Sequence, residues 1–175
     1  MTEGRFISIE GGEGAGKSTQ IALLAEKLKA LGLSVDLTRE PGGTEGAEAI
    51  RQLLLGGGDE RWGASAEAML FAAARSDHVE KRIKPAVAQG IWVISDRFLD
   101  SSRAYQGASL GLSDAVIMDL HRIGSGVICR IGRLYSIYRW KLRAFGHRPA
   151  MVTVRTVSEG ATMPFTSVFA MLFIK

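Results

Sequence analysis

Apolar residues follow two different patterns along the first 126 residues of the chain. Short apolar runs predict buried β-strands over residues 5–10 and 91–95, and residues 34–38 predict a further strand between them. Apolar residues spaced three or four positions apart predict a helix that ends near Gly32, then helices over residues 45–55, 64–89 (interrupted near Pro85) and 113–124. Strands that alternate with helices in this way are typical of an α/β fold with a parallel sheet covered on both faces.

The pattern changes after Gly126. Residues 127–175 show little helical periodicity and few helix caps, so we divide the chain into a core of residues 1–126 and an atypical C-terminal segment of residues 127–175. The net charge of the chain is +4, to which the core contributes −3 and the segment +7. The basic residues of the segment form no stripe, so nucleic acid is not an expected partner.

Composition narrows the class of protein further. A chain of 175 residues that is 46% apolar and 23% charged can bury the core of one domain. Its single cysteine, Cys129, cannot form an internal disulfide, and the N-terminus, with an acid at Glu3, does not resemble a signal peptide. The apolar stretches are too short to span a membrane. We therefore expect a cytoplasmic globular protein without a membrane partner.

A glycine-rich loop directly follows the first predicted strand. Residues 11–18 read GGEGAGKS, which fits the pattern GxxxxGK[ST], and a predicted helix follows. The backbone N–H groups of such a loop bind phosphate, Lys17 reaches the β- and γ-phosphates, and Ser18 offers its hydroxyl to Mg²⁺. A chance glycine turn is the alternative, which the flanking strand and helix disfavour. The predicted ATP phosphate-binding residues are Gly11, Gly12, Glu13, Gly14, Ala15, Gly16, Lys17, Ser18 and Thr19.

Two residue pairs outside the loop have side chains suited to nucleotide chemistry. Asp96 and Arg97 end a buried strand, where an acid can hold Mg²⁺ and an arginine can bind phosphate; a surface ion pair is the alternative. Phe71 and Arg75 share one helix face, which suits a base and its phosphate. The spacing alone favours the other interpretation of this second pair, a core phenylalanine beside a solvated arginine.

Together these segments resemble the bacterial thymidylate kinases, which phosphorylate dTMP with ATP. The resemblance rests on IEGGEGAGKST (9–19), TREPGGT (38–44), EAIRQLLL (48–55), MLFAAARSDHV (69–79), VISDRF (93–98) and SSRAYQG (101–107). It implies a three-layer P-loop nucleoside monophosphate kinase fold with a central parallel sheet, ATP as co-substrate with Mg²⁺, and a homodimer. A kinase for another nucleoside monophosphate, an inactive nucleotide-binding remnant and a nucleic-acid-binding protein with a basic tail remain alternatives.

The resemblance also implies roles for individual residues. Lys17, Arg97 and Glu13 become the catalytic residues, with Glu13 near the sugar and the transferred group, and Ser18 and Asp96 become metal ligands. Phe71 stacks on thymine, and Pro41 shapes the turn over the nucleotide. The implied dTMP-binding residues are Pro41, Arg51, Phe71, Arg75, Arg97, Ser101, Tyr105 and Gln106.

The C-terminal segment departs from the family, which has a further strand and an arginine-bearing lid after about residue 126. We interpret the segment as the product of a reading frame shifted at Gly126; a divergent native tail is the alternative. In the shifted frame, Trp140–Lys141 forces a glutamate codon and Met151–Val152 a glycine codon. At the other codons, the amino-acid sequence leaves some bases undetermined, and these can be chosen so that the shifted frame encodes a strand and a lid rich in glycine and arginine. We therefore expect the last strand and the lid to be disrupted and turnover to be impaired.

Overall fold

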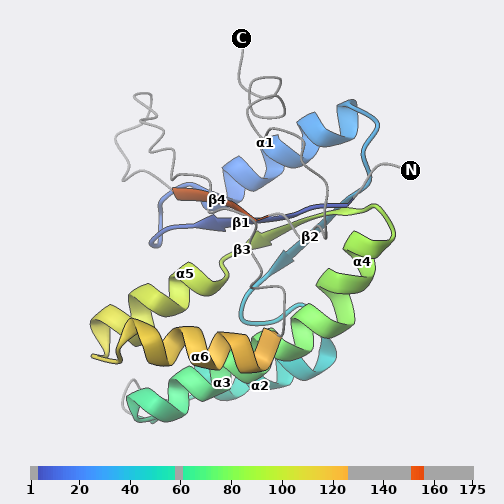
Figure 1. Cartoon of the computed structure of the whole chain (residues 1–175). Helices are drawn as coiled ribbons and strands as arrows, with labels where there is room; N and C mark the ends of the chain where they lie inside the picture. Colours follow the sequence, from blue (N-terminus) through green and yellow to red (C-terminus); the bar gives the residue numbers. More distant parts are fainter. Residues whose placement is uncertain (1–3, 58–60, 126–150, 156–175) are drawn as a thin grey trace.

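The computed structural model describes residues 4–57, 61–125 and 151–155 (Figure 1). The strands are β1 (Phe6–Glu10), β2 (Val35–Arg39), β3 (Trp92–Asp96) and β4 (Met151–Arg155). The helices are α1 (Lys17–Ala30), α2 (Glu45–Leu55), α3 (Ala64–His78), α4 (Lys84–Ala88), α5 (Leu99–Ser102) and α6 (Asp114–Ser125). Two wide π-helical turns complete the helical part: η1 (Val79–Ile83) joins α3 to α4, and η2 (Arg103–Ser109) continues α5.

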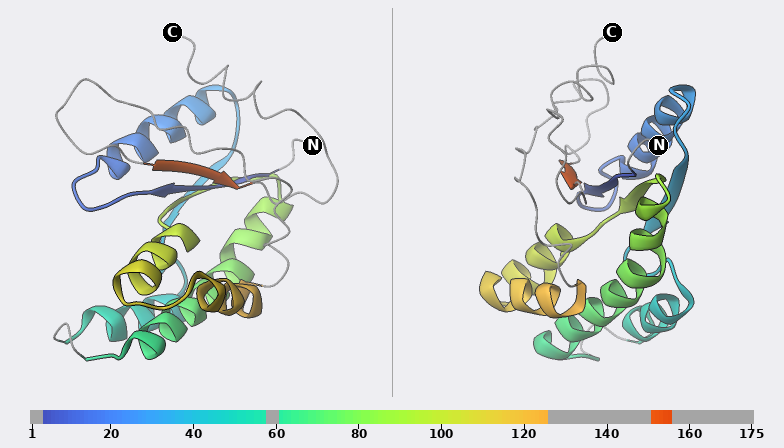
Figure 2. Two further views of the ribbon diagram at one scale, coloured as in Figure 1. Left: turned by 60° about the vertical axis from the view of Figure 1, so that its left-hand side comes forward. Right: turned by 45° about the vertical axis from the view of Figure 1, so that its right-hand side comes forward.

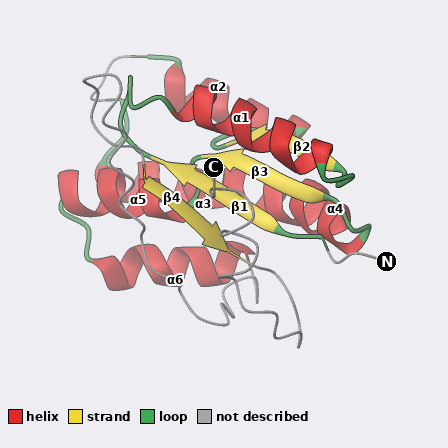
Figure 3. Ribbon diagram, turned by 90° about the horizontal axis from the view of Figure 1, so that it is seen from above, coloured by secondary structure: helices red, strands yellow, loops and turns green. Residues whose placement is uncertain are grey.

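The four strands form one sheet in the order β2-β3-β1-β4 (Figure 3). Strand β3 lies parallel to both of its neighbours, with Phe6 of β1 opposite Val93. This confirms the predicted parallel sheet, whose strands start and end within one residue of the predicted bounds. Strand β4 runs antiparallel to β1 and lies in the segment for which the sequence predicts no element. Its pairing spans more than 140 residues of chain, which local periodicity does not reveal.

Side chains alternate between the two faces of the sheet and build two separate cores. On one face, Ile7, Ile9 and Ile94 pack against α1 through Ile21 and Leu28. On the other face, the cluster contains these residues: Phe6, Val79, Ile83, Val93, Phe98, Leu99 and Ile117. Figure 2 shows the resulting layers, with α1 on one side of the sheet and the remaining helices on the other. The three-layer α/β arrangement expected from the sequence is therefore confirmed.

The long helical segment predicted over residues 64–89 consists of α3, η1 and α4 in one continuous run. Pro85 lies in the first turn of α4 and has no backbone N–H, so it cannot donate the hydrogen bond to the preceding turn that other residues of a continuous helical run donate. The wide turn η1 comes directly before this position. The interruption predicted near Pro85 therefore takes the form of a change in helical pitch and not a break.

Helix α2 begins with a side-chain cap. The hydroxyl of Thr44 accepts a hydrogen bond from the backbone N–H of Ala47 at 3.3 Å, and Glu45 and Glu48 lie in the first turn. The cap closes the turn that follows β2 and fixes where the helix starts. Within the described ranges, no helix has the length and apolar character that a membrane crossing requires.

Candidate nucleotide-binding site

The carboxyl ends of β1, β2 and β3 lie at the same edge of the sheet. Asp96 at the end of β3 is in register with Ile9 of β1 and with Arg39 of β2. Backbone hydrogen bonds continue past the strand ends, because the N–H of Glu40 donates to the carbonyl of Asp96 at 2.9 Å and the N–H of Arg97 donates to Ile9 at 3.0 Å. The glycine-rich loop, the turn after β2 and the Asp96–Arg97 pair therefore meet at one edge, where α/β folds bind ligands.

The glycine-rich loop joins β1 to α1 as predicted. Gly14 has φ +68° and Gly16 has φ +80°, conformations that residues with a side chain rarely adopt. Gly16 is the N-cap of α1, and the helix has neither a side-chain cap nor an acidic residue in its first turn. The N–H groups at the start of α1 are therefore available to an anion, and the helix dipole favours negative charge there.

The Lys17 ammonium group lies against the loop itself. Its Nζ donates to the carbonyls of Gly11 and Gly12 at 3.1 and 2.9 Å, and the residue is 9% exposed. Glu13 and Ser18 are exposed. The structure thus places the nine predicted phosphate-binding residues in the loop and the first turn of α1, while their contacts with phosphate stay a prediction.

The residues predicted to hold Mg²⁺ fit that ion chemically. The Oδ1 atom of Asp96 is buried and has no hydrogen-bond partner among the described residues. A carboxylate and a hydroxyl are oxygen ligands of the kind that Mg²⁺ prefers, and the ion commonly keeps waters and substrate phosphates as its other ligands. Among the described residues, no group of three or more acidic, histidine or cysteine side chains forms a complete metal cage. A magnesium ion at Ser18 and Asp96 would therefore depend on the nucleotide for further ligands.

Arg97 has a strained backbone beside the loop. Its φ is +74°, the one positive φ of a residue other than glycine within the described ranges. The buried Ser95 hydroxyl donates to the Arg97 carbonyl at 2.8 Å and helps to hold this conformation. The Nη1 atom of Arg97 lies 3.4 Å from both Ser101 Oγ and Tyr105 Oη, and the guanidinium carbon lies 5.3 Å from the centre of the Tyr105 ring. Strain of this kind is typical of functional sites.

Arg75 is a buried cation and not the solvated arginine that the helical spacing alone favours. The residue is 3% exposed, and its Nε donates to Glu40 Oε2 at 2.8 Å. Its Nη2 donates to Ser102 Oγ at 2.7 Å and to the Phe98 carbonyl at 3.3 Å. These hydrogen bonds use Nε and Nη2, and Nη1 donates to none of the described residues. Phe71, one turn earlier on α3, is half-buried.

The turn between β2 and α2 contains Pro41, which follows a cis peptide bond. The guanidinium group of Arg51 donates to the Pro41 carbonyl at 2.7 Å, so the side chain braces the turn. The backbone N–H of Gly43 donates to Glu48 at 2.9 Å, and this hydrogen bond, together with Arg39, lowers the pKa of the Glu48 carboxyl. Helix α2 and the turn thus form one connected unit.

The residues after β3 lie on α5 and η2, a helical stretch that the sequence pattern does not predict. Ser101 donates to the buried Glu10 carboxylate at 2.6 Å, and Tyr105 is exposed. Gln106 is buried, and its amide donates to Glu67 of α3 at 2.8 Å. Ser101 and Tyr105 therefore lie beside Arg97, while Gln106 ties η2 to α3.

Sequence reasoning missed several residues that hold the predicted ones. Glu40, Ser102 and Glu10 are buried polar residues in contact with Arg75 or Ser101. Two of them could have been found from the sequence, because Glu10 ends a predicted strand and Glu40 closely follows one, as Asp96 does. The contacts themselves join residues 27 to 91 positions apart, which no sequence pattern shows.

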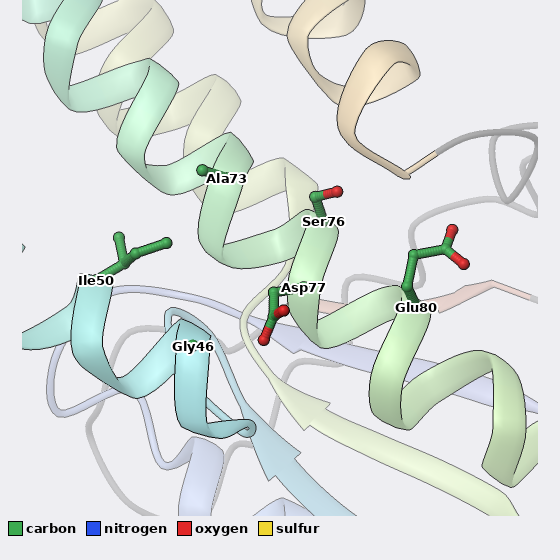
Figure 4. Close-up of a pocket in the computed structure, with 6 residues that line it drawn as sticks. All are labelled: Gly46, Ile50, Ala73, Ser76, Asp77 and Glu80. Carbon is green, nitrogen blue, oxygen red and sulfur yellow. The ribbon is translucent and has the colours of Figure 1, made fainter.

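A separate pocket of about 430 Å³ lies between α2 and α3 (Figure 4). Its lining residues are Gly46, Ile50, Ala73, Ser76, Asp77 and Glu80. A Cβ atom on Gly46 would lie 2.8 Å from the Asp77 carboxylate, so the glycine allows the two helices to approach closely. The pocket contains none of the predicted site residues, and it is distinct from the edge of the sheet described above.

The loop, the sheet order and the strand-end arginines place the chain among the α/β P-loop kinases. Comparison with known proteins then gives the family. The chain belongs to the thymidylate kinase family, because the family model described as Thymidylate kinase matches residues 9–123.

Individual relatives agree with the family model. The core is 64% identical over 122 residues to a thymidylate kinase of Rhizorhabdus wittichii, a match that covers 70% of this chain and 59% of the relative. It is 59% identical over 116 residues to one of Afipia carboxidovorans, which covers 66% of this chain and 50% of the relative. The chain thus spans between half and three fifths of the length of these relatives.

A solved structure supports the fold assignment. The crystal structure of thymidylate kinase from Ehrlichia chaffeensis matches with a TM-score of 0.64 and 41% sequence identity. The match covers 70% of this chain and 68% of that chain. The resemblance expected from the sequence motifs is therefore confirmed at the level of family and fold.

Proposed function

We propose that the chain binds ATP and dTMP and transfers the γ-phosphate of ATP to dTMP, giving dTDP and ADP. The observation that carries this proposal is the meeting of the glycine-rich loop with Arg75 and Arg97 at one edge of the sheet. The loop suits a triphosphate, and the two guanidinium groups suit the phosphate of an acceptor. The names of the relatives support dTMP as that acceptor.

The transfer follows the general logic of phosphoryl groups. An oxygen of the dTMP phosphate attacks the γ-phosphorus in line, the bond from this phosphorus to the β–γ bridging oxygen breaks, and ADP leaves with those electrons. Charge spreads over the equatorial oxygens, where Lys17 and Arg97 neutralise it. The attacking phosphate is ionised at neutral pH, so no strong general base is needed. Glu13 lies in the loop where it can contact the sugar or the transferred group.

Mg²⁺ belongs to this proposal as the ion that neutralises the phosphates of ATP when it is bound. Ser18 and Asp96 would hold it, in keeping with the buried and unpartnered Oδ1 of Asp96. The acceptor pocket would be lined by Phe71 against the base and by Ser101, Tyr105 and Gln106 around the base and sugar.

A coupled assay of ADP release tests the proposal directly. The purified chain is given MgATP with dTMP, UMP, CMP or AMP in turn. We expect ADP release to depend on dTMP and to exceed that seen with the other acceptors. Equal rates with all four acceptors would identify a kinase of another specificity, and calorimetric binding of MgATP without any turnover would identify an inactive nucleotide-binding remnant.

We also propose that turnover is impaired by residues 127–175. The family model ends at residue 123, and the matches to relatives extend over 108–126 residues, which supports a change of sequence near Gly126. A missing lid arginine would cost about 10³–10⁵ in rate by analogy with other phosphoryl-transfer enzymes. A shifted reading frame after Gly126 accounts for this change; the segment where the family has its lid lies outside the described residues, apart from residues 151–155.

A homodimer in the cytoplasm completes the proposal. Large apolar side chains are exposed on α2, α3 and α6, among them Leu55 (62%), Met69 (54%) and Ile123 (83%). Such side chains gathered on neighbouring helices suit a second copy of the chain. Sedimentation equilibrium tests this part, and a monomer at micromolar concentration would contradict it.

A further inference from the structure

Arg97 occupies the point where the chain leaves the sheet. Strand β3 ends at Asp96, and helix α5 begins shortly after Arg97, at Leu99 (Figure 1). The φ of Arg97 is +74°, and the next residue, Phe98, has an extended backbone with a φ of −161°. A residue with a side chain adopts a positive φ only at an energetic cost, so neighbouring contacts must hold Arg97 in this conformation.

Both backbone polar groups of Arg97 are tied to the sheet. Its N–H donates to the carbonyl of Ile9 in β1 at 3.0 Å, which continues the parallel pairing past the end of β3. Its carbonyl accepts a hydrogen bond from the hydroxyl of Ser95 at 2.8 Å. Because peptide groups are planar, fixing the peptides on both sides of the Arg97 Cα also fixes the direction in which the side chain leaves the backbone.

Ser95 is placed by the sheet itself. It lies in β3 opposite Ser8 of β1 and Thr38 of β2, so both neighbouring strands hold its backbone. The residue is 0% exposed, and bulk water does not compete for its hydroxyl. The hydroxyl is therefore a fixed donor to the Arg97 carbonyl, and it stabilises the strained conformation of Arg97.

The end of the Arg97 side chain has neutral neighbours. Its Nη1 lies 3.4 Å from both Ser101 Oγ and Tyr105 Oη. The Ser101 hydroxyl donates its proton to the Glu10 carboxylate at 2.6 Å, so it faces Arg97 as an acceptor. Arg97 has no carboxylate partner among the described residues, and its charge is therefore available to an anionic ligand.

We infer that Ser95 is a positioning residue, whose hydroxyl holds the Arg97 backbone so that the guanidinium group meets the phosphate of the monophosphate substrate. The inference rests on the proposed function, because it assumes that Arg97 binds this phosphate. Ser95 itself does not touch the substrate in this account and acts only through Arg97. An arginine that is held in place before the substrate arrives loses less conformational freedom on binding, which increases the affinity for phosphate.

The contribution of the phosphate group can be measured separately from that of the base and sugar. It is the ratio of the Kd of thymidine, which has no phosphate, to the Kd of dTMP, both measured by calorimetry on the full chain. A loss of folded protein lowers the measured amount of binding sites and leaves this ratio unchanged. The ratio therefore distinguishes positioning of Arg97 from a purely structural role of Ser95.

The test compares the unchanged chain with Ser95→Ala, which removes the hydroxyl and keeps the rest of the side chain. We expect the ratio to fall about threefold to tenfold, as loss of one hydrogen bond implies, while thymidine and MgATP bind as before. A thiol is a weak donor, so Ser95→Cys should also lower the ratio, by about threefold. This second variant carries the test if Ser95→Ala does not fold.

Two further variants separate the possible explanations. Ser125→Ala is the matched control, because Ser125 is also 0% exposed and its hydroxyl oxygen lies 3.2 Å from His121 Nδ1 within α6. It removes a buried serine hydroxyl that does not hold Arg97, and we expect it to leave the ratio unchanged. In Ser95→Ala/Arg97→Ala, the ratio should equal that of Arg97→Ala alone, because Ser95 acts only through Arg97.

The outcomes distinguish failure of this inference from failure of the proposed function. If the unchanged chain binds dTMP no better than thymidine, the proposed function fails, and the inference fails with it. If the chain prefers dTMP and Arg97→Ala lowers the preference, but Ser95→Ala and Ser95→Cys leave the ratio unchanged, the inference alone is wrong. An equal fall in Ser125→Ala, or additive losses from Ser95→Ala and Arg97→Ala, would likewise overturn it.

Discussion

Arg75 and Arg97 lie near the same edge of the sheet, yet the protein holds their side chains by different means. Arg75 is buried and paired with a carboxylate, and its guanidinium carbon lies 5.2 Å from the centre of the Phe98 ring. Arg97 is partly exposed, and its guanidinium group lies beside the hydroxyls of Ser101 and Tyr105. The first cation is fixed in advance, whereas the second has no carboxylate partner among the described residues.

Replacing Lys17 by Met tests the role of the glycine-rich loop. The ammonium group bonds only the carbonyls of Gly11 and Gly12 among the described residues, so its removal should leave the fold intact. We expect MgATP affinity to fall about ten- to hundredfold, as loss of a charge-assisted hydrogen bond implies. Calorimetry measures this, and an unchanged affinity for MgATP would contradict the predicted phosphate contact.

Replacing Gly43 by Ala tests how tightly the turn after β2 packs against His78. In Gly43→Ala, the new Cβ meets Thr38 and His78 within 2.7 Å, at a φ of +93° that alanine rarely adopts. We expect the free energy of unfolding to fall by about 1–3 kcal/mol. Gly107→Ala is the control, because its Cβ meets nothing closer than 3.6 Å. Equal melting temperatures for the two variants would show that the turn is not tightly packed.

At the scale of elements, the sequence predicts what depends on local pattern and misses what depends on distant contacts. The helix over residues 45–55 is predicted with its exact bounds, because its apolar period is clear and Thr44 caps it. Helices α5 and η2 are missed, because residues 99–109 contain few apolar positions and are ordered by contacts such as Gln106 with Glu67. The glycine-rich loop needs only local residues and is predicted completely.

The same division applies to the site. Phe71 and Arg75 share a helix face, as spacing predicts, but spacing alone also suggests that Arg75 is solvated. Its burial depends on Glu40, which is 35 residues away, and on Ser102, which is 27 residues away. No local period encodes either contact. The spacing alone makes a base-and-phosphate role for Phe71 and Arg75 the less favoured interpretation, and the resemblance to a family is what favours it.

Asp77 links α3 to the start of α2. Its carboxylate accepts from the Thr44 hydroxyl at 2.5 Å and pairs with Lys81 at 2.5 Å. Hydrogen bonds from Lys81 and then from Thr44 lower the pKa of Asp77 below its ordinary value. The folded protein therefore holds this carboxyl in its ionised form more strongly than the unfolded chain does.

This shift gives a stability prediction with a definite sign. A carboxyl whose pKa is lowered by folding stabilises the protein above its ordinary pKa, and this contribution disappears as the pH falls through the folded-state pKa. Asp77→Asn should therefore lower the free energy of unfolding by about 1 kcal/mol at pH 7 and have little effect at strongly acid pH. Urea unfolding at several pH values measures the difference, and a constant difference across pH would contradict the assignment.

At the scale of the whole molecule, the core and the C-terminal segment behave differently. Strands β1, β2 and β3 of the core are parallel. Strand β4, from the atypical segment, lies antiparallel beside β1. The antiparallel strand pairs with a backbone edge of β1 that would otherwise be exposed. The sheet therefore gains an edge strand from residues that the family model does not cover.

A restored reading frame tests the proposal about this segment. A gene with one base inserted at codon 126, so that later codons begin at the former third positions, encodes a different C-terminal part. We expect its product to release ADP from ATP and dTMP about 10³–10⁵ times faster than the present chain, because a lid arginine returns. Equal rates, with both products folded by circular dichroism, would instead favour a divergent native tail.

The wide turn η1 has a consequence for chain length. A turn with hydrogen bonds from residue i to i+5 absorbs one extra residue, so the helices before and after it keep the faces that they would have in a regular α-helix. Here the extra residue falls among Val79–Ile83, a stretch that includes Arg82, whose guanidinium group donates to Asp36 of β2. A relative that is shorter by one residue at this point would thus keep both helix faces but lose the contact between Arg82 and β2. Insertions and deletions between relatives should therefore be more frequent here than elsewhere in the helix.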